Sequence, residues 1–168
     1  MFNFDVLIIG SGLAGLSTAL KLADHKKIAI ISKRKLADSS SHWAQGGIAA
    51  PISDHDSPEA HISDTKVAGA GLCDPKVTKF VVENGRKALS WLSQNGVSFT
   101  KDKNSKKLHL TQEGGHSHRR IAHVADSTGR AVQDRLIETV LANPNIHIFE
   151  DHIAVDLITS NKIEIINN

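Results

Sequence analysis

The residues with the clearest chemical meaning are glycines that follow an apolar run near the start of the chain. After residues 6–9, the sequence continues as Gly10-Ser11-Gly12-Leu13-Ala14-Gly15. Glycines at this spacing serve the tight turn, the close approach of a pyrophosphate and the packing of a helix on a strand. The N–H groups and the dipole at the start of a helix also favour phosphate. The pattern predicts a dinucleotide-binding loop, and the alternative is an ordinary glycine-rich turn between a strand and a helix.

The end of the next apolar run leaves the identity of the dinucleotide open. This run covers residues 28–31. An acidic side chain that binds a ribose hydroxyl is expected after it, about 20 residues beyond the glycine loop. Ser32 and Lys33 stand there instead. By spacing alone this basic end suits the 2′-phosphate of NADP, and a strand end that faces solvent is the alternative.

A second set of residues could contact a flat, polar ring. It combines small hydroxyls, an amide and paired glycines, in the order Ser40, Ser41, His42, Trp43, Ala44, Gln45, Gly46, Gly47. The edge of an isoalloxazine ring needs hydrogen-bond donors of this kind, because the protein orients a flavin that carries the redox chemistry. The alternative is an irregular loop anchored by Trp43. Since Trp43 and the apolar residues 48–50 belong to this connection, we expect it to pack against the protein.

A third set lies between residues 113 and 120 and combines a carboxylate, two imidazoles and two guanidiniums around a glycine pair. Guanidinium groups bind carboxylates in a bidentate manner, so Arg119 and Arg120 could receive an acidic substrate; ordinary surface charges are the alternative. The histidines at 116, 118 and 123 lack a cysteine or carboxylate at ligand spacing, so we predict no metal site. Cys73 precedes a helix start, and we expect a small core residue without a reaction to perform.

Composition narrows the class of protein. The chain has 168 residues with 20 Lys and Arg against 18 Asp and Glu, a net charge of +2, and no block of like charges. No nucleic-acid partner is therefore predicted. A single cysteine excludes an internal disulfide framework and favours a reducing, cytoplasmic setting. The short N-terminal apolar run, which glycines interrupt, is predicted to be a core strand rather than a signal peptide or membrane span.

The pattern of apolar residues and breakers predicts an α/β fold. A strand, helix and strand occupy residues 4–32, and further helices cover about 58–70, 75–95 and 130–142. Residues 97–100 and 107–110 are predicted to form a hairpin, residues 146–149 a third sheet strand, and residues 153–159 and 162–166 a final hairpin. On the helix at 75–95, one face is expected to be apolar through Val77, Phe80, Val81, Ala88, Leu89 and Leu92.

Four stretches together resemble the L-aspartate oxidase family, within the wider group of succinate dehydrogenase and fumarate reductase flavoproteins. They are residues 8–16, 44–50, 69–74 and 113–121. The first two are shared with the wider group, and the last is more specific to L-aspartate oxidases. The resemblance covers essentially the whole chain. It implies a Rossmann-like FAD-binding domain that is incomplete at its C-terminal side, with residues 1–168 as its N-terminal part and with capping and C-terminal helical domains absent.

The resemblance also implies an activity. L-aspartate is oxidised to iminoaspartate in NAD biosynthesis, oxygen or fumarate reoxidises the flavin, and a quinolinate synthase step lies downstream. The alternatives are a fragment of a succinate dehydrogenase or fumarate reductase flavoprotein, and a non-catalytic FAD-binding remnant. The substrate arginines of the family lie beyond Asn168, so no catalytic residue is expected within the chain, which alone is expected to be inactive. It is also expected to be poorly soluble or partly unfolded, because sheet edges would be left exposed.

Individual site residues follow from the same resemblance. The loop at 10–15 would contact the FAD pyrophosphate, Lys33 is the family's usual residue at its strand end, and residues 40–47 would lie along the flavin. Ile153 and Ala154 match a stretch that returns to the adenosine end of FAD. Ser40 stands where succinate dehydrogenases carry the histidine that links the flavin, which implies non-covalent FAD. Glu113 matches the carboxylate near the substrate amino group, which suits an amino acid because a carboxylate pairs with an ammonium but repels a further acid group.

Overall fold

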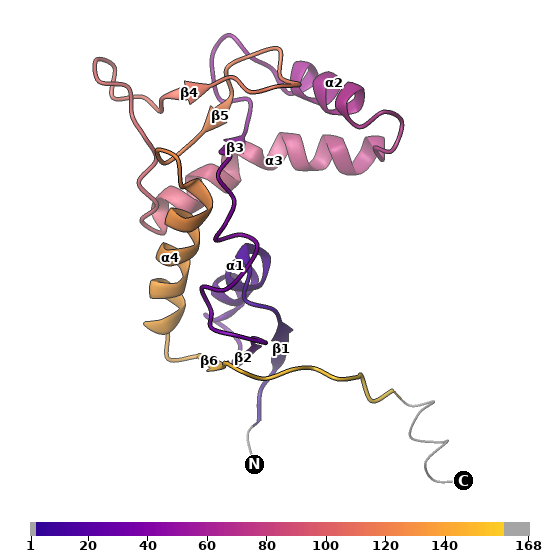
Figure 1. Cartoon of the computed structure of the whole chain (residues 1–168), viewed down its shortest axis with the longest axis vertical. Helices are drawn as coiled ribbons and strands as arrows, with labels where there is room; N and C mark the ends of the chain where they lie inside the picture. The colour runs from indigo at the N-terminus through magenta and orange to yellow at the C-terminus, as the bar shows by residue number, and fades with distance from the viewer. Residues whose placement is uncertain (1–2, 160–168) are drawn as a thin grey trace. The chain divides into compact units, whose positions relative to one another are not determined.

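The computed structural model describes residues 3–159, which form two compact units (Figure 1). The first unit contains the residues up to Ser39 and those from Leu136 on, and the second contains Ser40–Arg135. Helix α4 (Thr128–Leu141) contributes residues to both. The predicted helix at 130–142 is therefore confirmed, with a start two residues earlier.

The first unit is built around a parallel sheet. Strands β1 (Val6–Ile9), β2 (Ile28–Ile31) and β6 (Ile146–Phe149) are arranged in the order β1-β2-β6. Val6 lies opposite Ile28, which in turn lies opposite Ile146. Helix α1 (Leu13–Leu22) connects β1 to β2. This is the Rossmann-like βαβ arrangement that the sequence predicts.

The core of this unit lies between β2 and α1. Ile28 and Ile30 of β2 and Leu16 and Ala19 of α1 are fully buried. A continuous apolar strand such as β2 is typical of a central parallel strand covered on both faces. In β1, by contrast, Leu7 and Ile9 are each 55% exposed.

The second unit pairs two helices with a small antiparallel sheet. Helices α2 (Pro58–Ala68) and α3 (Pro75–Gln94) pack against each other and run side by side in Figure 1. The sheet has the order β3-β5-β4, with β3 (Ile48–Ala49), β5 (Ile121–Ala122) and β4 (Leu110–Thr111). These two-residue strands carry too little periodicity to be found in the sequence, and the sequence analysis missed them.

Polar caps start both helices where the sequence places them. The Ser57 hydroxyl accepts a hydrogen bond from the N–H of Ala60, and the Asp74 carboxylate accepts from the N–H groups of Lys76 and Val77. Proline follows each cap, at the first helical position. Gly96 ends α3 with a φ of +88°, a left-handed conformation that favours glycine.

Two expectations about packing and strands are wrong. On α3, Leu89 and Leu92 are buried as predicted. The predicted Val77, Phe80, Val81 and Ala88 are exposed, and Thr78 and Val82 are buried instead. The buried stripe is thus rotated away from the predicted face at the start of the helix. Residues 97–100 form no named strand. The chain nevertheless turns at Asp102, whose N–H bonds the carbonyl of Lys107, and a single bridge joins Lys101 to Leu108.

The last part of the chain departs from its prediction as well. No strand occurs at residues 153–159, and the second strand of the predicted final hairpin, at 162–166, lies outside the described residues. Within residues 3–159, no helix combines the length and apolar character needed to cross a membrane.

Candidate functional site

The glycine loop of the first unit has the shape of a phosphate cradle. Gly10 adopts a φ of +111°, and a Cβ at Gly15 would overlap the carbonyl oxygen of Gly10. Both positions therefore require glycine for the turn from β1 into α1. Gly12 is the N-cap of α1, in an extended conformation, and no side chain caps the helix there. An uncapped helix start behind a glycine turn suits an anionic phosphate, so the residues present fit a pyrophosphate.

A serine pair joins this loop to the end of β2. The hydroxyls of Ser11 and Ser32 lie 2.9 Å apart, and both side chains are buried. The Ser11 hydroxyl also donates to the carbonyl of Leu36. Ser32 is thus buried against the glycine loop, and Lys33 beside it is exposed. Sequence reasoning noted the missing acid but not this link between the loop and the strand.

In the second unit, the segment at 40–47 is held on the first turn of α4. The N–H of Gly129 donates to the carbonyl of Ala44, and a Cβ at Gly129 would overlap the carbonyl oxygens of Ser41 and Ala44. His42 is largely buried, with its Nδ1 3.7 Å from a carboxylate oxygen of Asp134. The expectation of a packed connection holds at Ala50, which is fully buried, but fails at Trp43, which is 73% exposed.

A pocket brings two sets of predicted site residues together. It has a volume of about 620 Å³, and its lining residues are Gln45, Gly47, Thr111, Glu113, His123, Ala125 and Asp126. A Cβ at Gly46 would lie 3.7 Å from Oε2 of Glu113. Gln45 and Gly47 from the segment expected along the flavin, and Glu113 expected at the substrate amine, therefore line one pocket inside one unit. Sequence reasoning missed His123 and Asp126 as lining residues, because nothing in their spacing relates them to Gln45.

Arg120 occupies a different place from the one expected. Its side chain is fully buried, and its Nε and Nη2 form two hydrogen bonds of 2.8 Å to the carboxylate of Asp56. Its Nη1 lies 2.7 Å from Oδ2 of Asp64. Both roles considered for Arg120 are therefore wrong in the described structure, because its guanidinium is neither a surface charge nor open to an acidic substrate. The partners Asp56 and Asp64 are more than 50 residues away in sequence, so no local pattern reveals them.

The electrostatics of this cluster favour the charged form of Asp64 and the neutral form of His61. Hydrogen bonds from the backbone and hydroxyl of Ser117, with a further contribution from Arg120, lower the pKa of Asp64 to about 2. Burial lowers the pKa of His61, and the neighbouring Arg120 and His116 lower it further, against smaller opposing effects of Asp56 and Asp64. Hydrogen bonds to Asp56 and Asp64 outweigh burial in raising the pKa of Arg120.

A hydrogen bond joins His123, which lines the same pocket as Glu113, to His109. Nδ1 of His109 lies 2.9 Å from Nε2 of His123, so one ring donates a hydrogen bond to the other. His109 itself lines a second pocket of about 890 Å³, together with Arg86, Lys107 and Arg119.

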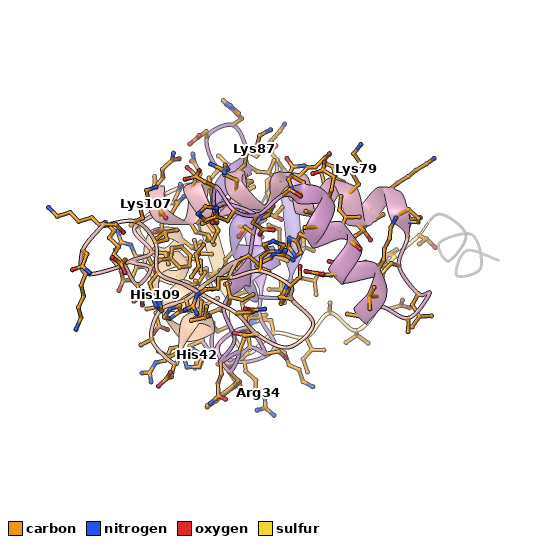
Figure 2. The ribbon with its side chains drawn as sticks, turned by 90° about the horizontal axis from the view of Figure 1, so that it is seen from above. Arg34, His42, Lys79, Lys87, Lys107 and His109 are labelled. Atoms are coloured by element: carbon orange, nitrogen blue, oxygen red, sulfur yellow. The ribbon has the colours of Figure 1, made fainter. Side chains whose placement is uncertain are left out.

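Figure 2 labels His109 and Lys107, which come from the same loop of the second unit, and shows Lys79 and Lys87 of α3 pointing away from the protein.

The remaining predicted positions lie outside both pockets. Ile153 is 63% exposed, and Ala154 beside it is exposed in a segment without a named strand. The Cys73 thiol is partly buried and donates to the carbonyl of Thr65 at 3.4 Å. Among the residues that the structure describes, no three His, Cys, Asp or Glu side chains are grouped so that they could hold a metal ion.

Comparison with known proteins shows the family to which the chain belongs. The model of a family described as FAD binding domain matches residues 5–166. L-aspartate oxidase 1 of Ralstonia nicotianae is 55% identical over 162 residues, which cover 96% of this chain and 30% of that protein. The L-aspartate oxidase of Pseudomonas aeruginosa is 49% identical over 168 residues, which cover 96% of this chain and 31% of that protein. The chain thus spans about 30% of the length of these curated relatives.

Solved structures share the fold. A quinol fumarate reductase of E. coli superposes with a TM-score of 0.89 at 32% identity, over 95% of this chain and 28% of that one. An Sdh1 complex of Mycobacterium smegmatis in its apo form gives a TM-score of 0.83 at 24% identity, over 88% and 27% of the two chains, which shows likeness of fold alone.

Proposed function

Because this chain belongs to the FAD-binding domain family, we propose that it is the FAD-binding part of an enzyme that oxidises L-aspartate to iminoaspartate. The observation that carries the proposal is the pocket in which Glu113 lies with Gln45 and Gly47. Relatives named L-aspartate oxidase support the choice of substrate. Oxygen or fumarate would reoxidise the enzyme, and the product would enter NAD biosynthesis.

FAD would be held by residues from separate segments. The backbone of residues 10–15 would bind the pyrophosphate, because Gly12 has no side chain and stands at an uncapped helix start. Residues 40–47 would lie along the flavin, Lys33 would stand at the end of β2, and Ile153 and Ala154 would contact the adenosine end. FAD, when bound, supplies the acceptor for the hydride that leaves the substrate carbon.

Glu113 would select an amino acid by pairing with its ammonium group. The side chain is exposed, and a Cβ at Gly114 would meet no atom within 4 Å. The backbone beside the carboxylate is therefore open to a ligand, and a charge-assisted hydrogen bond to an ammonium can form there. Succinate and fumarate lack this ammonium and would bring only carboxylates towards Glu113, so the residue disfavours them.

Non-covalent attachment of FAD fits the position of the nearest imidazole. Ser40 offers no ring nitrogen, and His42 is turned to Asp134. A covalent link would need His42 to leave this partner. We therefore propose that the flavin is released intact when the protein is denatured.

The experiment that tests the function joins this chain to the remaining part of the Ralstonia nicotianae protein, so that the chimera has the length of a relative. Glu113→Gln keeps the shape and removes the charge. Loss of a charge-assisted hydrogen bond predicts a fall of about 10- to 150-fold in kcat/KM for aspartate. Fumarate reduction should change far less. Equal losses with aspartate and fumarate would show that Glu113 holds the loop together and does not recognise the amine.

A further inference from the structure

We propose that Asp64 of α2 is a positioning residue that fixes the Glu113 loop through Ser117. This inference rests on the proposed role of Glu113 and adds a residue from a different element. Oδ2 of Asp64 accepts hydrogen bonds from the N–H of Ser117 at 2.8 Å and from its hydroxyl at 2.7 Å. The same oxygen accepts from Nη1 of the buried Arg120 at 2.7 Å. A single carboxylate oxygen thus joins α2 to two points of one loop.

The loop in question is closed at its base and turned sharply at its tip. It leaves β4 after Thr111 and returns to β5, and the N–H of Arg120 donates to the carbonyl of Thr111 at 3.1 Å. At the tip, the N–H of His116 donates to the carbonyl of Glu113, and the Gln112 side chain donates to the carbonyl of His116. Glu113 therefore belongs to a small turn whose next residue along the chain is Ser117.

Without its attachment to Asp64, this turn has little to hold it. Residues 112–115 are all exposed, so burial contributes little to their position. Apart from Asp64, the described contacts of the turn with α2 are the ring of His116 against that of His61 at 5.6 Å and the neighbourhood of Gly115 and Ala68. The Asp64–Ser117 pair supplies two directed hydrogen bonds at the residue that directly follows the turn.

Asp64 is itself held rigidly, as a positioning residue must be. It stands on a helix of 11 residues, and Arg120 is fixed by its bidentate contact with Asp56, whose side chain is 1% exposed. Two carboxylates thus face one guanidinium, with His61, His116 and His118 as the titratable groups around them. Asp64 thus joins this fixed guanidinium to Ser117 through one carboxylate oxygen.

The first test measures hydrogen exchange in the FAD-loaded chimera and needs no activity. Ser117→Ala removes only the hydroxyl contact, and Asp64→Asn removes the charge. We expect faster hydrogen exchange of the amides at residues 113–117 in both variants, while the amides of α3 stay protected. Ser117→Thr keeps a hydroxyl and should restore wild-type exchange. Unchanged exchange at 113–117 in both variants would overturn the proposal.

The second test measures kinetics in the FAD-loaded chimera. Asp64→Asn should lower kcat/KM for aspartate by about ten- to a hundredfold, because a misplaced carboxylate loses its aligned contact. Fumarate reduction should change far less. Asp54→Asn is the matched control, since its side chain is 86% exposed and pairs only with Lys107 at 3.6 Å among the described residues; it should leave both activities unchanged.

A double-mutant cycle separates this inference from the proposed function. In a Glu113→Gln background, Asp64→Asn should cost no more than about twofold further, because the two residues act on the same contact. Full, additive losses would overturn positioning and leave the function intact. If Glu113→Gln alone leaves aspartate kinetics unchanged, the proposed role of Glu113 fails. The exchange experiment still decides separately whether Asp64 holds the loop through Ser117.

Discussion

At the scale of single residues, Gly12 offers a clean test of the phosphate site. Its φ of −70° is accessible to any residue, so a side chain there causes no backbone strain. Gly12→Val should therefore leave the first unit folded but fill the space that a pyrophosphate needs. We expect the chimera with this change to lose its yellow flavin absorbance while its far-UV circular dichroism stays the same. Retention of the flavin spectrum would show that the phosphates bind elsewhere.

His61 predicts a pH dependence of stability. Its folded pKa is lowered, chiefly by burial and then by Arg120, so the unfolded chain binds the proton more readily. Stability is then fully present above the unfolded value of 6.5 and is lost as the pH falls towards the folded pKa. The slope for one proton is at most about 1.4 kcal/mol per pH unit.

The measurement is urea unfolding of the FAD-loaded chimera in steps from about pH 8 to about pH 5.5. His61→Gln retains a polar side chain that does not titrate here, and it should flatten the profile in this range. An identical slope in the variant would assign the dependence to other groups. Asp64, whose pKa is about 2, loses its contribution to folding stability only when the pH falls from about 4 to below about 2.

The residue types of the glycine loop, of Glu113 and of Gln45 could be read from the sequence because each lies in a contiguous motif. The roles of Ser32, Asp56 and Arg120 could not. Ser32 stands at the position of an expected acid, yet its hydroxyl is hydrogen-bonded to that of Ser11. In the sequence Arg120 resembles a surface charge, whereas in the structure it is paired with Asp56 and Asp64. Long-range partners of this kind leave no trace in local spacing.

At the scale of elements, the start of α4 determines where the segment at 40–47 lies. A Cβ at Gly129 would overlap the carbonyl oxygens of Ser41 and Ala44. Gly129→Ala gains about 0.5–1 kcal/mol of helix propensity, but the overlap with backbone costs about 1–3 kcal/mol. The overlap wins, so we expect a lower midpoint of thermal unfolding and weaker FAD binding in the chimera.

The matched control is Gly114→Ala, whose Cβ would enter open space; its unfolding midpoint should equal that of the unchanged protein. An unfolding midpoint for Gly129→Ala as high as that of Gly114→Ala would show that the segment at 40–47 is not held by α4.

Elements with strong local signals were predictable, and those defined by pairing were not. Ser57-Pro58 and Asp74-Pro75 mark the helix starts because caps and prolines act locally. The small sheet of β3, β5 and β4 depends on segments far apart in the chain, such as Ile48 against Ala122. The wrong apolar face of α3 has the same origin, since segments distant in sequence, such as α2, decide which of its side chains are buried.

At the scale of the whole molecule, the parallel sheet has consequences for association. Within the described residues, β1 and β6 each pair on one side only, and Leu7 and Ile9 are half exposed. Unpaired strand edges and exposed apolar side chains promote self-association. We expect the isolated 168-residue chain without FAD to associate in sedimentation analysis. A monomer with a sharp, cooperative thermal transition would contradict this.

The central claim is that this chain forms the FAD-binding part of an aspartate-oxidising enzyme. The most direct measurement mixes the purified, FAD-loaded chimera with L-aspartate in the absence of oxygen and follows the flavin absorbance. We predict that aspartate bleaches the oxidised flavin, that succinate at the same concentration leaves it yellow, and that fumarate restores the colour after aspartate. Bleaching by succinate with no response to aspartate would contradict the account and place the chain with the succinate dehydrogenase and fumarate reductase flavoproteins.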